Sequence, residues 1–229
     1  MNWPTIDEIR MFTPLPADYS WDLLRQDEID IAIAFFKTWF PSISVGMGSS
    51  LMDPAFYEEK VVGGDRRTTA ILAMVVRHSD EIVAIATWEK IDGPDVIFGR
   101  VGAVARPHRQ SNLAVAAQEL GEKMGRHMGA GLIYGMATTR TPYMQQALER
   151  AGYTAVGIMP GFDLEETEPG TLLRVYEVIY VKQLAPAEAF LMPSTHNFTP
   201  AVAGLYTAIF KEQSVHSSSH SPSVAAQHR

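Results

Sequence analysis

The sequence predicts an α/β (α+β) fold, with a mixed, mostly antiparallel sheet of about seven strands flanked by helices. Between residues 70 and 105, three strand-like segments follow one another with only short turns between them. After residue 110, helical and strand-like segments alternate, which indicates crossover connections. Apolar residues make up 46% of the 229 residues, so the chain can bury a core of this size.

The N-terminal part is expected to contain one strand and one helix. Residues 8–15 are predicted to form a short strand, which Pro14 and Pro16 stop. Residues 27–40 are predicted to form a helix that ends before Pro41. Its apolar residues lie at helical spacing on one face: Ile29, Ile33, Phe36 and Phe40.

A loop and a second helix are expected next. Residues 44–51 are rich in glycine and serine and are predicted to form a flexible loop. Asp53 is a suitable N-cap and Pro54 suits the first helical turn, while Gly63 and Gly64 end the helix.

The three strands of the central run are predicted at residues 70–77, 81–90 and 96–105. The first is almost continuously apolar, as expected for a strand that is buried on both faces. Residues 78–80 and 92–95 provide the two turns.

The clearest helix is predicted at residues 111–128. Its apolar stripe consists of Leu113, Ala117, Leu120, Met124 and Met128. A strand at 132–137 follows, and then a helix that opens at Thr141-Pro142 and ends at Gly152. Strands at 153–159 and 172–182 complete the sheet.

The chain is expected to divide into one domain and a C-terminal appendage. Residues 1–184 form the domain, and residues 185–213 form an extension with one helix. Residues 214–229 are rich in serine, histidine and alanine and are expected to be disordered.

Composition excludes several classes of function. The formal net charge is −7 and the basic residues are scattered, which argues against nucleic-acid binding. The chain has no cysteine, so thiolate chemistry and cysteine-bound zinc are excluded. The histidines of the tail have no fixed geometry, and we expect no metal site. No apolar run approaches the ~20 residues that span a bilayer, so we expect a cytoplasmic protein that does not bind membranes.

The segment 104–114 carries the strongest functional signal. It joins a strand to the clearest helix of the chain. The N-terminus of a helix presents unpaired backbone N–H groups and the positive end of the helix dipole, which suits a pyrophosphate. Ser111 and Ala114 are small enough for a phosphate to approach closely.

In this segment the sequence resembles the GNAT acyltransferase superfamily. The family signature at this junction is Arg/Gln-x-x-Gly-x-Gly/Ala, and this chain has Arg109, Asn112 and Ala114 at those positions, following Val104. A second family landmark is a helix that ends in Gly-Phe, which corresponds here to Gly152-Tyr153. The resemblance covers about residues 8–182.

The resemblance implies an N-acetyltransferase that uses acetyl-coenzyme A and a primary amine of a small molecule or peptide. Family members commonly dimerise, so a homodimer is possible. The resemblance also implies a set of residues that contact the cofactor: Gly102, Val104, Arg109, Gln110, Ser111, Asn112, Leu113, Ala114 and Thr141.

Two positions depart from the family pattern. Asn112 replaces a glycine, although asparagine tolerates unusual backbone angles better than most residues. Leu148 stands where many members have a tyrosine that protonates the leaving thiolate. These departures keep open a regulatory module that binds acyl-coenzyme A without efficient turnover. A second alternative is an N-acyl synthase, because the apolar loop and the C-terminal helix could accommodate a long-chain thioester.

Candidate acids and bases are few. Glu89 lies near the end of the middle strand and is the expected base, although a solvated carboxylate is the competing interpretation. Tyr143, near the start of a helix, is the expected replacement for the missing tyrosine. Arg100 lies in an apolar strand and either pairs with Glu89 or faces the acceptor. An acidic loop is also expected between the last two strands, and its charges are either solvated or attract a cationic amine: Asp163, Glu165, Glu166 and Glu168.

Overall fold

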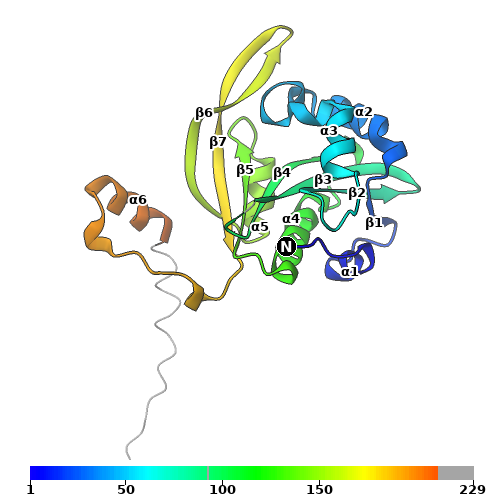
Figure 1. The fold of residues 1–229 in the computed structure, drawn as a ribbon. Coiled ribbons are helices and arrows are strands. Elements are labelled where there is room, and N and C mark those ends of the chain that lie inside the picture. Colours follow the sequence, from blue (N-terminus) through cyan, green and yellow to red (C-terminus); the bar gives the residue numbers. More distant parts are fainter. Residues whose placement is uncertain (92, 211–229) are drawn as a thin grey trace, which may run out of the picture. The chain divides into compact units, whose positions relative to one another are not determined.

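The computed structural model describes residues 1–91 and 93–210 (Figure 1). The chain divides into two compact units, one from Met1 to Ala189 and one that begins at Phe190. The first unit contains a seven-stranded sheet with the order β1-β2-β3-β4-β5-β7-β6. Its strands are β1 (Tyr19–Leu23), β2 (Ile71–His78), β3 (Glu81–Ile91), β4 (Val96–Val104), β5 (Leu132–Thr138), β6 (Thr154–Glu168) and β7 (Thr171–Gln183).

Only one pair of neighbouring strands in this sheet is parallel. β4 and β5 run in the same direction, because helix α4 (Leu113–Met128) crosses over between them. The other pairs are antiparallel. The structure therefore confirms the predicted mixed, mostly antiparallel sheet.

One face of the sheet is covered by α1 (Ile6–Phe12), α4 and α5 (Tyr143–Arg150), as Figure 1 shows. The core on this side includes Trp88, Leu120 and Met124, whose side chains are buried. Burial of such large apolar side chains contributes about 1.5–3 kcal/mol each. The apolar stripe predicted for the clearest helix therefore faces the sheet.

The opposite face carries the helices between β1 and β2. These are α2 (Ile29–Trp39), α3 (Pro54–Phe56) and a π-helical turn at Tyr57–Val61. Phe36 and Tyr57 are fully buried against Ile85 and its neighbours on this side. As predicted, the Asp53 side chain caps α3, accepting a hydrogen bond from Ala55 N at 3.0 Å.

The predicted strand at residues 8–15 is wrong, because α1 occupies this region. The Thr5 hydroxyl accepts a hydrogen bond from Glu8 N, and the Glu8 carboxylate accepts one from Thr5 N. This capping box fixes the start of the helix, and Ile9 packs into the core without exposure. The first strand is β1 instead, which sequence analysis missed.

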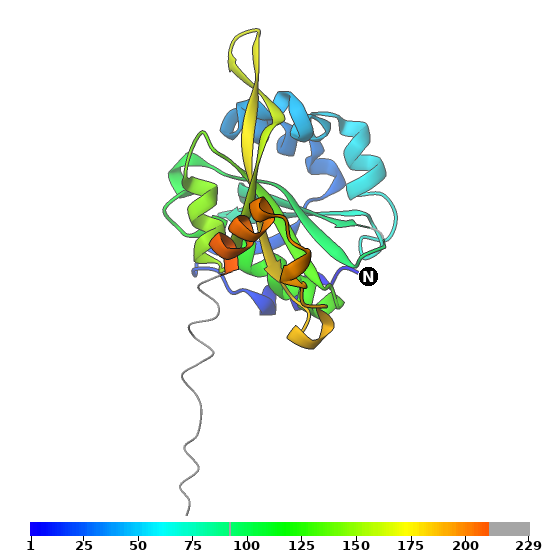
Figure 2. The same ribbon diagram turned by 90° about the vertical axis from the view of Figure 1, so that its left-hand side faces the viewer.

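The predicted loop at residues 44–51 forms short 3-10 helices at Pro41–Ser44 and Gly46–Met52. The acidic residues from Asp163 to Glu168 are not in a loop either. They belong to β6, which pairs with β7 as far as Glu168 and Thr171. Figure 2 shows this long hairpin extending past the helices on either side of the sheet.

The second unit contains helix α6 (Pro200–Phe210). Val202 and Leu205 of this helix are exposed within the described structure. The tail predicted at residues 214–229 lies outside the described residues. The predicted domain boundary at residue 184 precedes the division of the two units by five residues.

Candidate active site

β4 and β5 separate halfway along their length. They pair from Val96 opposite Leu132 to Gly99 opposite Gly135, and the pairing stops there. At this point β4 contains a bulge, because Trp88 opposes Gly99 while Thr87 opposes Val101. Arg100 is the extra residue, and a bulge bends its strand locally. The β5-facing edge of β4 from Arg100 to Val104 is therefore unpaired.

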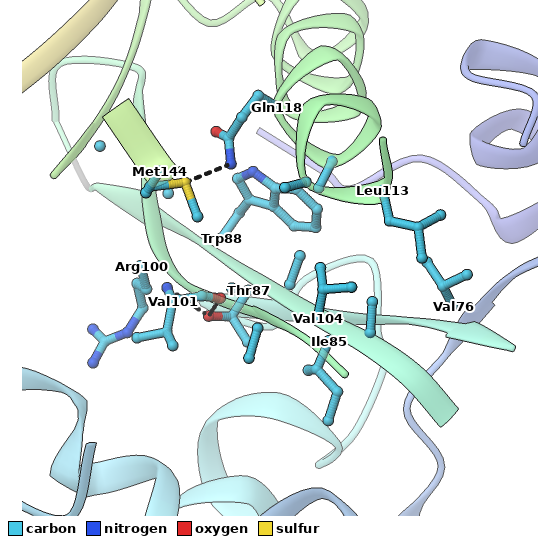
Figure 3. A pocket seen from close by; sticks show the side chains of 18 of the residues that line it. Val76, Ile85, Thr87, Trp88, Arg100, Val101, Val104, Leu113, Gln118 and Met144 are labelled. Carbon is cyan, nitrogen blue, oxygen red and sulfur yellow. Dashed lines mark hydrogen bonds between the residues drawn. The ribbon is translucent and has the colours of Figure 1, made fainter. Parts of the chain in front are cut away.

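The Thr87 side chain stabilises the bulge. Its hydroxyl donates to Val101 O at 2.9 Å and accepts from Val101 N at 3.1 Å (Figure 3). A small cavity of about 50 Å³ lies between the bulged strand and the helices α4 and α5. Figure 3 shows Trp88 close to Gln118 of α4, and the Gln118 amide reaches the Met144 sulfur at 3.9 Å.

A much larger groove, of about 930 Å³, opens where the two strands diverge. Its floor is the free part of β4 with the C-terminal part of β5 and Glu177 in the middle of β7, and α4 and α5 form one wall. The short 3-10 helices after α2 and a segment of β6 line the other side. This volume is at the upper end of the range for small-molecule sites.

One end of the groove is basic. α4 begins here with no side chain bonded to its first-turn N–H groups, so these donors remain available. Arg106, Arg109 and Arg150 line the groove around this helix end. The Arg109 guanidinium donates to Val104 O at 3.2 Å and to Trp39 O at 3.4 Å. An anion placed here meets a helix N-terminus and three guanidinium groups.

Asn112 shapes the turn into α4. Its φ of 58° and ψ of 14° lie in the left-handed region, which glycine adopts most easily. Asparagine is one of the few other residues that visits this region routinely. Its side-chain oxygen accepts a hydrogen bond from Arg150 at 3.0 Å, which connects α4 to α5. The asparagine thus keeps the backbone geometry of a glycine at this position.

The other end of the groove is acidic. Asp163 and Glu165 from β6 and Glu177 from β7 all line it. Glu165 pairs with Arg140, and the Asp163 carboxylate accepts a hydrogen bond from Met47 N at 2.8 Å. Burial raises the pKa of Glu177 to about 7, and the negative charges of Asp163 and Glu165 add to the shift.

The architecture agrees with solved acetyltransferases. The E. coli ribosomal-protein-S18-alanine N-acetyltransferase superposes with a TM-score of 0.54 at 12% identity, over 76% of this chain and 99% of that one. The Vibrio cholerae spermidine/spermine N-acetyltransferase gives a TM-score of 0.58 at 9% identity, over 74% and 95%. A candidate acetyltransferase from Salmonella typhimurium, solved with acetyl-CoA, gives 0.58 at 12% identity, over 77% and 98%.

This chain has the GNAT fold. The predicted fold class is therefore confirmed. No protein-family model matches the sequence, and no curated protein is significantly similar to it.

The GNAT fold brings most of the predicted cofactor residues to one groove. Those that line it are Gly102, Val104, Arg109, Gln110, Asn112, Ala114 and Thr141. Ser111 and Leu113 are not among its lining residues. The Ser111 hydroxyl is 3.0 Å from the Tyr19 hydroxyl, and Leu113 is buried beside the small cavity. The binding roles of all these residues remain predictions.

The two predicted catalytic residues lie in different settings. Tyr143, the first residue of α5, lines the groove and is 72% exposed. Glu89 does not line the groove and forms an ion pair with Arg100, one of the two arrangements considered for that arginine. Leu148 is 1% exposed and lines the small cavity, so the position of the usual tyrosine is filled by core packing.

Sequence analysis missed Glu177 as a groove residue. The available signal was a single carboxylate inside the apolar strand Val175-Tyr176-Glu177-Val178-Ile179. A charged residue in such a strand is buried only rarely without a partner. Arg140 was also missed, because only the tertiary fold brings it to Glu165.

Within the described part of the chain, no group of three or more His, Asp or Glu side chains is arranged to hold a metal ion. No described helix is long and apolar enough to cross a bilayer.

Proposed function

We propose that this protein is an N-acetyltransferase that moves the acetyl group of acetyl-coenzyme A to a primary amine of a small molecule or peptide. The observation that carries the proposal is a single groove whose two ends carry opposite charges. Its basic end lies at the uncapped N-terminus of α4, its floor is an unpaired strand edge, and its far end carries carboxylates. The GNAT fold of the chain supports the same conclusion.

The groove residues fit the proposed co-substrate. The pyrophosphate would bind at the first turn of α4, beside Arg109 and Arg150. Ala114 lines the groove at this turn and leaves room for a phosphate. The pantetheine arm would follow the free edge of β4 near Gly102, whose backbone groups can bind amides. Acetyl-coenzyme A supplies an acyl group activated as a thioester.

The chain supplies donors and a proton route. Backbone N–H groups of the free edge of β4 would polarise the thioester carbonyl, as in an oxyanion hole. Tyr143 would protonate the departing thiolate, because Tyr143 lines the groove whereas Leu148 lies in the core. Glu89 would need to release Arg100 before it could act as a base.

Calorimetry with coenzyme A and turnover of acetyl-coenzyme A with a panel of primary amines test this proposal. The Ala114→Glu variant should lose coenzyme A affinity at least about tenfold, because it places a carboxylate at the phosphate site. A glutamate in the first turn of a helix is favourable, so the melting temperature should not fall. Thr171→Glu adds the same charge at the exposed hairpin tip and should bind normally. Unchanged affinity in folded Ala114→Glu would overturn the assignment.

A second candidate function is a regulatory module that binds acyl-coenzyme A without efficient turnover. The burial of Leu148 favours it, because the usual proton donor is absent from that position. Tight coenzyme A binding together with no acetylation of any amine in the panel would select this function.

A further inference from the structure

Glu177 is an unusual residue of the groove. Its side chain lines the acidic end, yet the residue is only 6% exposed. Among residues 1–91 and 93–210, no group forms a hydrogen bond or an ion pair with its carboxylate. A buried carboxylate normally has such a partner, since its desolvation costs several kcal/mol. Its oxygens are not among the side-chain atoms that are fully enclosed without a partner, so they are open to the groove, where a ligand can supply the partner.

The sheet directs Glu177 into the groove. Glu177 pairs with Thr138 on β5, and Thr138 also lines the groove. Its neighbour Val178 packs into the core on the α4 side, so the alternation of the strand directs Glu177 to the opposite face. On β6 the register jumps between Met159 and Asp163, and Phe162 and Asp163 of this irregular segment line the groove together with Glu177.

The charges around Glu177 are mostly negative. β6 contributes Asp163 and Glu165, and the segment after β5 contributes Arg140, which pairs with Glu165. The 3-10 helix Gly46–Met52 has no charged side chain and offers only Met47 N to Asp163. On β4, Arg100 is held by Glu89. Three carboxylates and one guanidinium leave two negative charges uncompensated at this end when all are ionised.

We propose that Glu177 is the base that takes a proton from the acceptor, and that the acceptor is an amine with a second positive charge, such as a diamine. The inference rests on the proposed N-acetyltransferase function. The reacting ammonium would lie against Glu177, and the second cationic group against Asp163 and Glu165. A negative site of this kind selects dications over amines that carry a carboxylate.

The proton balance follows directly. The reacting ammonium gives one proton to the Glu177 carboxylate and becomes a neutral amine. Its nitrogen then bonds to the acyl carbon as the carbon–sulfur bond breaks. Tyr143 gives its proton to the departing thiolate, the second proton of the nitrogen restores the Tyr143 hydroxyl, and Glu177 later releases its own proton to water. A base works best when its pKa lies near the working pH, and burial places the pKa of Glu177 at about 7.

Glu89 is less suited to this step. Its carboxylate is occupied by Arg100, whose guanidinium also lies 5.7 Å from the Phe56 ring. The unpartnered carboxylate in the groove is Glu177.

Binding of hexane-1,6-diamine, compared with 6-aminohexanoate, tests the inference without turnover. Wild type should bind the diamine at least about tenfold more tightly. Its affinity should rise between pH 6 and pH 8, because binding a cation requires the ionised carboxylate. In Glu177→Gln this pH dependence should disappear, while coenzyme A affinity stays the same. Glu168→Gln removes an exposed carboxylate of the same hairpin that does not line the groove, and it should behave as wild type.

Turnover of the diamine gives an independent readout. Glu177→Gln should lower kcat/KM by about 10²–10³ at pH 7, within the range for loss of a general base. The loss should shrink toward pH 10, where the amine loses its proton without help. A merely structural role would not give this recovery.

Three outcomes would overturn the inference. These are equal affinity for the two ligands, unchanged pH dependence of diamine binding in Glu177→Gln, and an unchanged pH profile of turnover in that variant. If coenzyme A binds and other amines are acetylated, the proposed function survives such a failure. A lack of coenzyme A binding in wild type would overturn the proposed function itself.

Discussion

Met47 and Asp163 lie 116 positions apart in the sequence and are joined by a hydrogen bond of 2.8 Å from the Met47 N–H to the Asp163 carboxylate. The same carboxylate oxygen accepts from Leu164 N at 2.8 Å. This contact holds the 3-10 helix Gly46–Met52 against β6, so the two segments enclose the acidic end of the groove. The size of the acceptor site therefore depends on this junction.

Gly46 makes the junction possible, and its replacement by alanine should open it. The φ of Gly46 is +73°, and a Cβ there would lie 2.1 Å from the Asp163 carboxylate and 2.6 Å from Leu164 O. We expect Gly46→Ala to raise KM for the amine about tenfold, because the segment must move away from β6. Affinity for coenzyme A, measured by calorimetry, should change little.

Gly64→Ala is the matched control for this substitution. Gly64 has a similar φ of +69°, but a Cβ there meets no atom within 4 Å. Both variants carry the cost of an alanine in the left-handed region, about 1–2 kcal/mol. Only Gly46→Ala should change KM, and an equal effect in both would show that the clash with Asp163 has no role.

Asn112 is predicted to be replaceable by glycine but not by alanine. Asn112→Ala should lower the free energy of unfolding by about 1 kcal/mol, because alanine disfavours a φ of 58°. Asn112→Gly removes that backbone cost and loses only the hydrogen bond from Arg150. Urea unfolding of the three proteins would measure the difference. Equal stability of the two variants would contradict the backbone explanation.

The sequence predicted the central strands and the junction between the strand and the helix at residues 104–114 well, because both depend on local patterns. Continuous apolar runs mark buried strands, and an apolar stripe at helical spacing marks the helix that follows. The N-terminal helix was missed because a strand was expected at residues 8–15, whereas the capping box of Thr5 and Glu8 starts a helix.

The acidic end of the groove could not be predicted from local sequence patterns. Glu177, Asp163 and Arg140 come together only through the register of β5, β6 and β7, which local patterns do not determine. The bulge at Arg100 likewise depends on the pairing of β4 with β3. A single carboxylate in an apolar strand was the one sequence signal for Glu177.

Glu177 should make the protein less stable as the pH rises. Its folded-state pKa, about 7, is raised above the ordinary value of 4.5, so the folded state binds the proton more tightly. Stability is therefore lost between pH 4.5 and pH 7, on the order of 3 kcal/mol when the shift is converted to free energy.

Glu177→Gln removes this titration. The variant should be more stable than wild type at pH 8 and about equal to it at pH 4.5. Urea unfolding at both pH values measures the difference, with Glu168→Gln as the control. A difference that does not depend on pH would indicate a packing effect rather than the charge of Glu177.

Tyr143 is the remaining candidate for the acid that protonates the thiolate. It is the first residue of α5, lines the groove and is 72% exposed, while Leu148 lies in the core. Tyr143 therefore lines the groove, whereas the side chain at position 148 does not.

We expect Tyr143→Phe to lower kcat about tenfold to a hundredfold with the best amine acceptor, because the variant keeps the ring and loses only the hydroxyl. Leu148→Met conserves volume in the core and should retain most of the activity. Turnover of both variants, measured against pH, separates the possibilities. If Tyr143→Phe keeps the wild-type kcat and pH profile, the thiolate departs without an acid from the protein, and the electrostatic effect of the β4 backbone carries the reaction.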